Sequence, residues 1–211
     1  MKLKHLLFFL FLSLISCQQV IEETSKIVSE QAKPKLKGKY HSLQKENVKI
    51  FLPEGFKYIT HEEYKNVLKQ IGDSTLYNAE VQRLDNIKIN DKKLYIFEYP
   101  ESASTLNVLV EKYLPFNKED GKYLLGIIST MQKNTYNIKD LNTELKEARV
   151  MGNKNLKIFK AIYKFTNPSF PASQKFFRHY YLISYNKKTL FLNMESTQLI
   201  DFDPYLRKIK M

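Results

Sequence analysis

The 211-residue sequence contains no tryptophan, only six glycines and a single cysteine, Cys17. One cysteine excludes an intrachain disulfide. The scarcity of glycine argues against a glycine-rich loop that cradles phosphate groups. The apolar run from Leu6 to Ile15 is only about ten residues long, whereas a membrane-spanning helix needs ~20. We therefore expect an ordinary globular domain that follows a short apolar segment.

The N-terminus has the pattern of an export signal. Residues 1–5 are basic and precede the apolar run, which is typical of a secretory signal peptide. The run ends in Leu14-Ile15-Ser16-Cys17, which resembles the bacterial lipobox. This resemblance implies that the Cys17 thiol is joined to diacylglycerol, that residues 1–16 are removed and that the new amino group is acylated. The alternative is an ordinary signal peptide with a cysteine near its end by chance.

The resemblance also implies a location. Lipid chains on Cys17 would hold the protein stably in a membrane of the bacterial cell envelope. Gln18 follows the cysteine where some families carry an aspartate that retains the protein in the inner membrane, so the outer membrane is favoured, on its periplasmic or surface face. We therefore predict three parts: a signal peptide over 1–16, a lipid anchor and flexible tether over 17–39, and a single domain over 40–211.

The charge of the chain is strongly positive. The formal net charge is +12, and loss of the two lysines of the signal peptide would leave +10. Because an exported protein rarely meets nucleic acid, anionic glycolipid or phospholipid is favoured over nucleic acid as the neighbour. Lys33, Lys35, Lys37 and Lys39 of the tether are the candidates for contact with lipid phosphates. The alternative is that these lysines, like the others scattered along the chain, only keep the surface solvated.

Two helices begin with recognisable signals. Thr60-His61-Glu62-Glu63 has the pattern of a capping box and precedes apolar residues at helical spacing, from Tyr64 to Ile71. Asn117 is the expected cap of a later helix, in which Leu124, Ile127, Ile128 and Met131 form the apolar face. We expect close packing of that helix on a sheet to explain Gly121 and Gly126. Residues 74–84 are expected to form a second helix or a continuation of the first. Asp203-Pro204 is expected to cap a short terminal helix.

Strand patterns fill the remainder of the domain. They cover 48–52, 56–59, 94–97, 106–114, 159–166, 176–185 and 190–194, with a less regular stretch over 138–150. Gly152-Asn153 and Asn186-Lys187-Lys188 are expected to form tight turns, which join antiparallel strands. Both faces of 176–185 are apolar, so this strand should be covered on both sides. The fold class predicted is α+β, an antiparallel sheet flanked by helices.

Several of these features resemble the PsbP-like fold, a family that includes an extrinsic subunit of photosystem II and a Ran-binding protein. They are the motif Leu52-Pro53-Glu54-Gly55-Phe56, the strand pair before Leu114-Pro115-Phe116-Asn117, the helix after it, and the closing hairpins that end in 191–196. The resemblance covers 48–210 and implies an α/β/α sandwich. It implies no catalytic residues, because members mostly act as binding or assembly proteins.

No constellation of residues predicts a catalytic or metal site. His61-Glu62-Glu63 lacks the second histidine of a zinc helix, since the fourth residue after His61 is Lys65. His41 has no partner in the sequence, and His179 fits the interior of an aromatic strand. Ser129 is not in a nucleophile elbow. Asp201 and Asp203 could bind a cation with Glu195 or act as acid and base, but a capping role for Asp203 is favoured.

The function expected is therefore that of a non-enzymatic binding or assembly module without cofactor, metal or nucleic acid, which docks on another envelope protein. The alternative is a small-ligand binder or weak hydrolase that uses a cleft between sheet and helices. The alternative predicts that His179, Asp201 or a glutamate meets another polar group in one pocket. The spatial distribution of His61, His179, Asp201 and Asp203 therefore separates the two hypotheses.

Overall fold

The computed structural model describes residues 36–44, 46–71, 74–89, 93–135, 142–153, 155–166 and 175–211. The chain divides into two compact units, Met1–Lys37 and Gly38–Met211, and every element described below belongs to the second. Cys17, the signal peptide over 1–16, and Lys33 and Lys35 lie outside the described residues, so those expectations stay predictions. None of the helices in the described part is both long and apolar enough to span a membrane.

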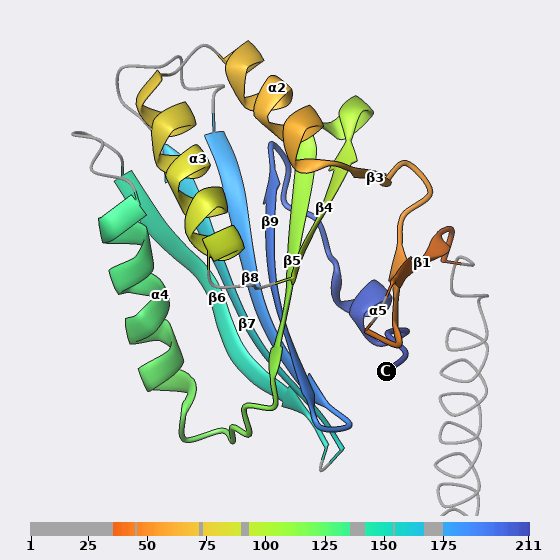
Figure 1. The fold of residues 1–211 in the computed structure, drawn as a ribbon. Helices are drawn as coiled ribbons and strands as arrows, with labels where there is room; N and C mark the ends of the chain where they lie inside the picture. Colours follow the sequence, from red (N-terminus) through yellow and green to blue (C-terminus); the bar gives the residue numbers. More distant parts are fainter. Residues whose placement is uncertain are drawn as a thin grey trace, which may run out of the picture. The chain divides into compact units, whose positions relative to one another are not determined.

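A seven-stranded antiparallel sheet organises the domain, with strand order β3-β4-β5-β9-β8-β7-β6 (Figure 1). Its strands are β3 (Lys57–Ile59), β4 (Lys93–Tyr99), β5 (Ser104–Lys112), β6 (Asn142–Gly152), β7 (Leu156–Thr166), β8 (Lys175–Tyr185) and β9 (Lys188–Ser196). The predicted turns are confirmed: Gly152 has φ +108°, and Asn186 and Lys187 have φ of 46° and 64° between β8 and β9. A 3-10 turn, η1 (Pro100–Ser102), joins β4 to β5.

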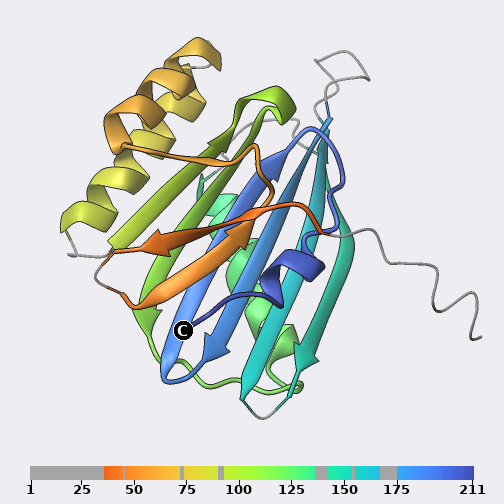
Figure 2. The same ribbon diagram turned by 90° about the vertical axis from the view of Figure 1, so that its right-hand side faces the viewer.

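The two faces of the sheet carry different layers (Figures 1 and 2). One face is covered by α2 (His61–Ile71), α3 (Ser74–Ile89) and α4 (Gly121–Thr135). The other is covered by the hairpin of β1 (Lys39–Leu43) and β2 (Val48–Leu52), which is a separate two-stranded sheet, and by α5 (Asp203–Leu206). The α+β architecture is as predicted. Strand β1 was not predicted, because its sequence Lys-Tyr-His-Ser-Leu continues the polar composition of the tether.

Apolar side chains fill both layers. Tyr181 and Ile183 of β8 point to the layer of β1, β2 and α5, where Phe202 and Leu206 are also buried. Tyr180 of the same strand points to the helix layer. Strand β8 is thus covered on both sides, as its two apolar faces predicted.

The predicted capping box at the start of α2 is confirmed. The backbone N–H of Glu63 donates to Thr60 Oγ1 at 3.2 Å, and the Glu63 carboxylate accepts from the Thr60 N–H at 2.6 Å. Before α4, Asn117 Oδ1 accepts from the N–H groups of Glu119 and Asp120, at 2.9 and 3.3 Å. Asn117 therefore orders the turn that leads into α4, which begins four residues later at Gly121.

The apolar face predicted for α4 is confirmed for two of its four residues and wrong for the other two. Leu124 and Ile128 are buried, but Ile127 and Met131 are 40% and 42% exposed. The expected close packing at Gly126 is also wrong, because a Cβ atom there would meet nothing within 4 Å. The helix touches the sheet along a narrower stripe than its apolar spacing suggested, and the remaining apolar residues point away from it.

Glycine is required at a different place, within the motif that resembles the PsbP-like fold. A Cβ atom at Gly55 would lie 2.1 Å from the ring of Tyr99 in β4. The next residue, Phe56, is buried and its ring packs edge-on to Tyr99, with 5.4 Å between the ring centroids. The Gly55-Phe56 pair therefore fixes the turn after β2 against the sheet.

Candidate functional site

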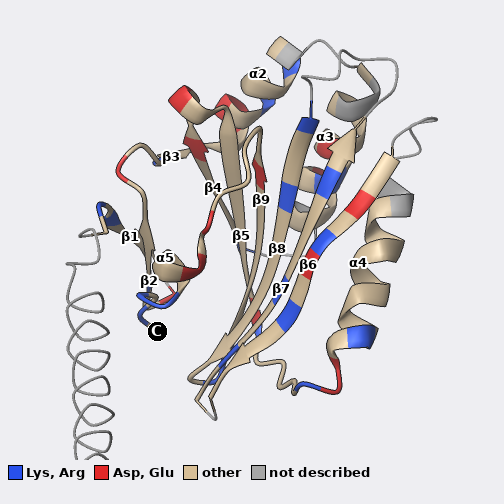
Figure 3. Cartoon of the chain, turned by 180° about the vertical axis from the view of Figure 1, so that it is seen from behind, with Lys and Arg blue, Asp and Glu red and all other residues tan. Residues whose placement is uncertain are grey.

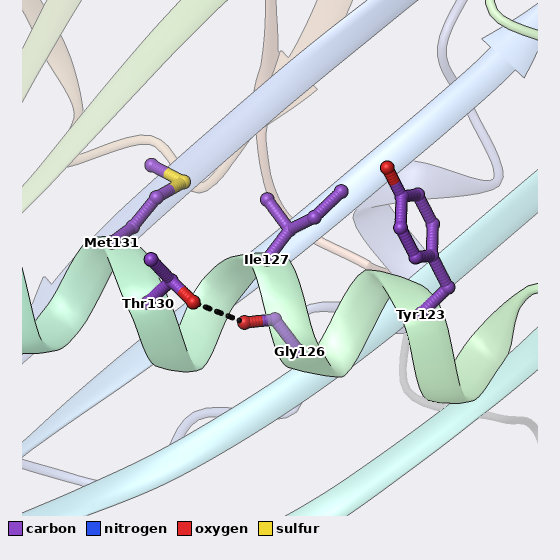
Figure 4. Close-up of a pocket in the computed structure, with 5 residues that line it drawn as sticks. All are labelled: Tyr123, Gly126, Ile127, Thr130 and Met131. Carbon is purple, nitrogen blue, oxygen red and sulfur yellow. Dashed lines mark hydrogen bonds between the residues drawn. The ribbon is translucent and has the colours of Figure 1, made fainter.

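The outward face of α4 carries several exposed apolar side chains. Tyr123 is 71% exposed and lies on the same side as Ile127 and Met131 (Figure 4). Gly126 and Thr130 complete this face, and the Thr130 hydroxyl donates to the Gly126 carbonyl at 3.0 Å. We call these five residues the α4 stripe. They line a shallow hollow of about 460 Å³.

The chemistry of the α4 stripe suits contact with apolar groups. Its side chains are an aromatic ring, a branched aliphatic chain and a thioether, and none carries a charge. Thr130 keeps its hydroxyl occupied by its own helix, which leaves a methyl group for contact. None of its five residues is a histidine, a cysteine or an acidic residue.

A cluster of charges, two of them buried and two partly exposed, lies between the sheet and α5. Lys160 of β7 is 3% exposed, and its ammonium lies 3.0 Å from Glu147 Oε2 and 3.1 Å from Asp203 Oδ1. Arg149 of β6 pairs with Glu147 at 2.9 Å and also contacts Asp203. Strand β6 and its neighbour β7 carry these charges on adjacent positions (Figure 3). Two cations and two carboxylates thus neutralise one another and join α5 to the sheet.

His179 lies on the same face of the sheet as this cluster. It is fully buried, its Nδ1 lies 3.3 Å from the Tyr181 hydroxyl, and its Nε2 has no partner among the described residues. Burial and the nearby charge of Lys160 lower the pKa of His179 to about 4, against a smaller opposing effect of Asp203. The imidazole is therefore neutral near pH 7 and belongs to the core, as its place on an aromatic strand predicted.

The predicted capping role of Asp203 is wrong. The cap of α5 is Phe202, which makes no side-chain capping bond, and Asp203 instead faces Lys160 and Arg149. Asp201 accepts from the Asp203 N–H at 3.2 Å and so stabilises this turn. The sequence did not reveal these partners because β6 and β7 lie more than forty residues away along the chain.

One signal for the cluster was present in the sequence. Lys160 alternates with Ile158 and Ile162, both buried on the same face of β7. A lysine between two inward-facing residues on a strand covered on both sides predicts a buried cation that needs a carboxylate partner.

A second polar network fills the layer between the sheet and the helices. The Tyr64 hydroxyl donates to Glu80 at 3.0 Å, and Glu80 also accepts from Arg83 at 2.8 and 2.5 Å. Burial raises the pKa of Glu80, but the hydrogen bonds and charge of Arg83 outweigh it and leave the pKa below its ordinary value. Glu195 of β9 contacts Arg178 of β8 on this face. Glu195 and the α5 cluster are thus on opposite faces of the sheet, and Glu195 cannot share a cation with Asp201 and Asp203.

Two amide oxygens in this layer lack partners. Asn107 of β5 and Asn193 of β9 lie directly opposite each other in the sheet. Asn107 is 4% exposed, and the Oδ1 atoms of both residues are buried without a hydrogen-bond partner among the described residues. Buried amide oxygens of this kind commonly accept from ordered water.

The remaining candidate residues are dispersed. His61 is the first residue of α2, and Ser129 lies within α4. His41 of β1 packs edge-on to Phe97, with 5.1 Å between the ring centroids. Within the described residues no group of three or more His, Cys, Asp or Glu side chains could hold a metal ion. Of the four residues that separate the two hypotheses, His179, Asp201 and Asp203 share one face of the sheet, and His61 does not.

Comparison with known proteins gives a likeness in fold. No protein-family model and no curated protein sequence matches the chain. Among solved structures, the chain is similar to the solution structure of cyanobacterial PsbP (CyanoP) from Synechocystis sp. PCC 6803, with a TM-score of 0.45 and 12% sequence identity. The similarity covers 85% of this chain and 95% of that chain. A likeness of this extent concerns the fold alone, and we take neither function nor binding residues from it.

Proposed function

We propose that this protein is a membrane-anchored lipoprotein of the bacterial envelope whose α+β domain is a non-enzymatic binding module. The observation that supports binding is the α4 stripe, an exposed apolar face on a helix whose Leu124 and Ile128 are buried. Ile127 and Met131 are 40% and 42% exposed although Leu124 and Ile128 of the same helix are buried. Contiguous apolar surface of this kind commonly marks a site of interaction.

The partner proposed is another envelope protein that places an apolar segment on the α4 stripe. Tyr123 supplies a large aromatic surface, a residue type enriched at the centres of interfaces. Open space at Gly126 lets a partner's backbone or side chain approach the helix closely. An assembly role of this kind needs neither cofactor nor catalytic residue.

The binding role is tested by site-specific photo-crosslinking in cells. A photoreactive amino acid replaces Ile127 in the full chain, and the matched control carries it at Leu199, which is 57% exposed but lies outside the stripe. We expect a defined adduct from position 127 only, and we expect the purified partner to bind the Ile127→Lys variant at least about tenfold more weakly than the parent. Adducts that are absent, or the same at both positions, would contradict the proposal.

The anchor is tested separately. If Cys17 carries lipid, the Cys17→Ser variant loses both processing and membrane retention, and intact-mass analysis of the membrane fraction shows an acylated Cys17 in the parent. Retention of the variant in the membrane would overturn the lipoprotein assignment without bearing on the α4 stripe.

The alternative function, a small-ligand binder or weak hydrolase between sheet and helices, has one observation in its favour. The side-chain oxygens of Asn107 and Asn193, which have no partner in the described part of the chain, would accept hydrogen bonds from a small polar ligand. Mass spectrometry of the extract from denatured, purified protein decides this alternative. A small molecule recovered in stoichiometric amount would support the alternative. If none is recovered, the alternative is contradicted, and water is the donor to the two oxygens.

A further inference from the structure

The outer surface of the β1–β2 hairpin gathers lysines and aromatic rings from three separate parts of the chain. Tyr40 of β1 lies opposite Phe51 of β2, with 5.0 Å between the ring centroids. Lys208 and Lys210 of the C-terminal segment lie over these rings, each with its ammonium 4.5 Å from a ring centroid, Lys208 over Phe51 and Lys210 over Tyr40. These four residues and Lys49 of β2 form a set of five that we call the basic aromatic face.

Backbone pairing fixes this arrangement. The N–H of Lys49 donates to the Lys210 carbonyl at 2.8 Å, and the N–H of Lys210 donates to the Lys49 carbonyl at 2.9 Å. Phe51 also stacks on Tyr205, with 5.9 Å between the centroids, which holds the C-terminal segment against the hairpin. The lysines are therefore presented together by the fold and are not merely near one another in a flexible tail.

The charge of this face is uncompensated. Lys49, Lys208 and Lys210 are all exposed. In the described ranges, no carboxylate forms a salt bridge with any of the three, whereas Lys160 within the domain has two acidic partners. Three neighbouring cations without acidic partners attract anions, and the exposed ring of Tyr40 suits the boundary between water and apolar groups.

The basic aromatic face lies next to the predicted tether, and this position indicates which anions the face would meet. The predicted tether enters the domain at Gly38, and Lys39 and Tyr40 follow at once as the first residues of β1. A domain held to a membrane through this segment keeps the basic aromatic face within reach of lipid headgroups. We infer that the basic aromatic face binds the phosphates of anionic phospholipid headgroups and thereby orients the domain on the membrane. This inference rests in part on the proposed lipid anchor.

The test uses the chain from residue 18 to 211 without lipid, so that Cys17 plays no part in it. This chain contains the whole compact unit Gly38–Met211. Binding is measured by flotation with vesicles of phosphatidylcholine alone and with vesicles that contain one third phosphatidylglycerol. We expect binding to the anionic vesicles only, since each lysine near such a surface contributes about fivefold to the partition.

Two triple variants with the same loss of charge locate the contact. The first variant replaces Lys49, Lys208 and Lys210 by glutamine. Its partition onto anionic vesicles should fall by roughly 100-fold, which is about fivefold for each lysine. The control replaces Lys69, Lys118 and Lys122, which are exposed on the helix side of the domain. No binding by the parent, or an equal loss in both triple variants, would overturn the inference. Stronger binding to soluble polyanions than to vesicles would also overturn it.

A fluorescence measurement gives an independent readout that does not depend on charge removal. Because the sequence contains no tryptophan, Tyr40→Trp introduces a single reporter within the basic aromatic face. Its emission should shift to shorter wavelength on addition of anionic vesicles, and that of the control Tyr123→Trp, on the helix side, should not. An unchanged spectrum of Tyr40→Trp, or equal shifts of both, would contradict docking through this face. Because neither chain carries lipid, failure here is distinct from failure of the anchor, which the Cys17→Ser fractionation measures.

Discussion

The ammonium of Lys160 and the carboxylate of Asp203 lie 3.1 Å apart, although the two residues belong to β7 and α5 and each is less than a tenth exposed. This ion pair connects the sheet to the segment that carries the basic aromatic face. A charge that is buried with its partner is tolerated, but a charge left alone in the same place is costly.

We predict that Asp203→Asn destabilises the domain by about 3 kcal/mol, because it leaves Lys160 and Arg149 with Glu147 alone. Chemical denaturation measures the loss. The control Asp201→Asn keeps an acceptor close to the Asp203 N–H and should cost less than about 1 kcal/mol. If the two variants are equally stable, the Lys160–Asp203 pair does not hold α5 on the sheet.

A pH dependence follows from His179. Its pKa is about 4 in the folded protein and 6.5 ordinarily, so between these pH values the unfolded chain binds a proton that the folded domain does not. Stability contributed by neutral His179 is therefore present above pH 6.5 and decreases as the pH falls toward 4, by about 3 kcal/mol in total.

The measurement is the free energy of unfolding at several pH values for the parent and for His179→Gln. The variant should lose most of the decrease between pH 6.5 and 4, whereas the control His61→Gln should retain it. The pKa of His41 is also lowered, first by burial and then by the charge of Lys39, so a smaller dependence remains in His179→Gln. If the free energy of unfolding changes with pH equally in the parent and in His179→Gln, the pH dependence does not come from His179.

Gly55 is predicted to tolerate no side chain. A methyl group there would overlap the ring of Tyr99, so Gly55→Ala should destabilise the domain by about 1–3 kcal/mol. Gly126→Ala is the matched control, because its Cβ atom meets open space within a helix, and it should stabilise the domain by up to about 1 kcal/mol. In thermal unfolding, the melting temperature should fall in Gly55→Ala and rise in Gly126→Ala. An unchanged melting temperature in Gly55→Ala would mean that the ring of Tyr99 moves aside freely.

The capping box of α2 should contribute measurably to stability. Thr60→Ala removes the oxygen that accepts from the Glu63 N–H, which costs about 1 kcal/mol. Thr60→Ser keeps that oxygen and should remain close to the parent in urea denaturation. A loss of the same size in both variants would assign the effect to packing of the Thr60 methyl group.

Local features of this protein were predictable wherever neighbours in sequence are neighbours in space. The capping box at Thr60, the turn ordered by Asn117 and the hairpin turns at Gly152 and Asn186 all depend on groups within a few residues of one another. Alternation along β8 correctly predicted a strand covered on both sides. The prediction for Ile127 and Met131 was wrong because helical spacing identifies an apolar side of a helix but not how much of that side the sheet can cover.

The sequence by itself determined the composition of the chain, its helix caps, its turns and the antiparallel order that tight turns impose, because these depend on local backbone geometry. It also contains the segment that resembles an export signal and a lipobox and ends in Cys17, on which the proposed anchor rests. Only the tertiary structure decided which charges are buried together and which lysines share a surface. Lys160 meets Asp203, and Lys49 meets Lys210, across long stretches of chain, and such pairs form because burial and sheet registry select them after the strands have assembled.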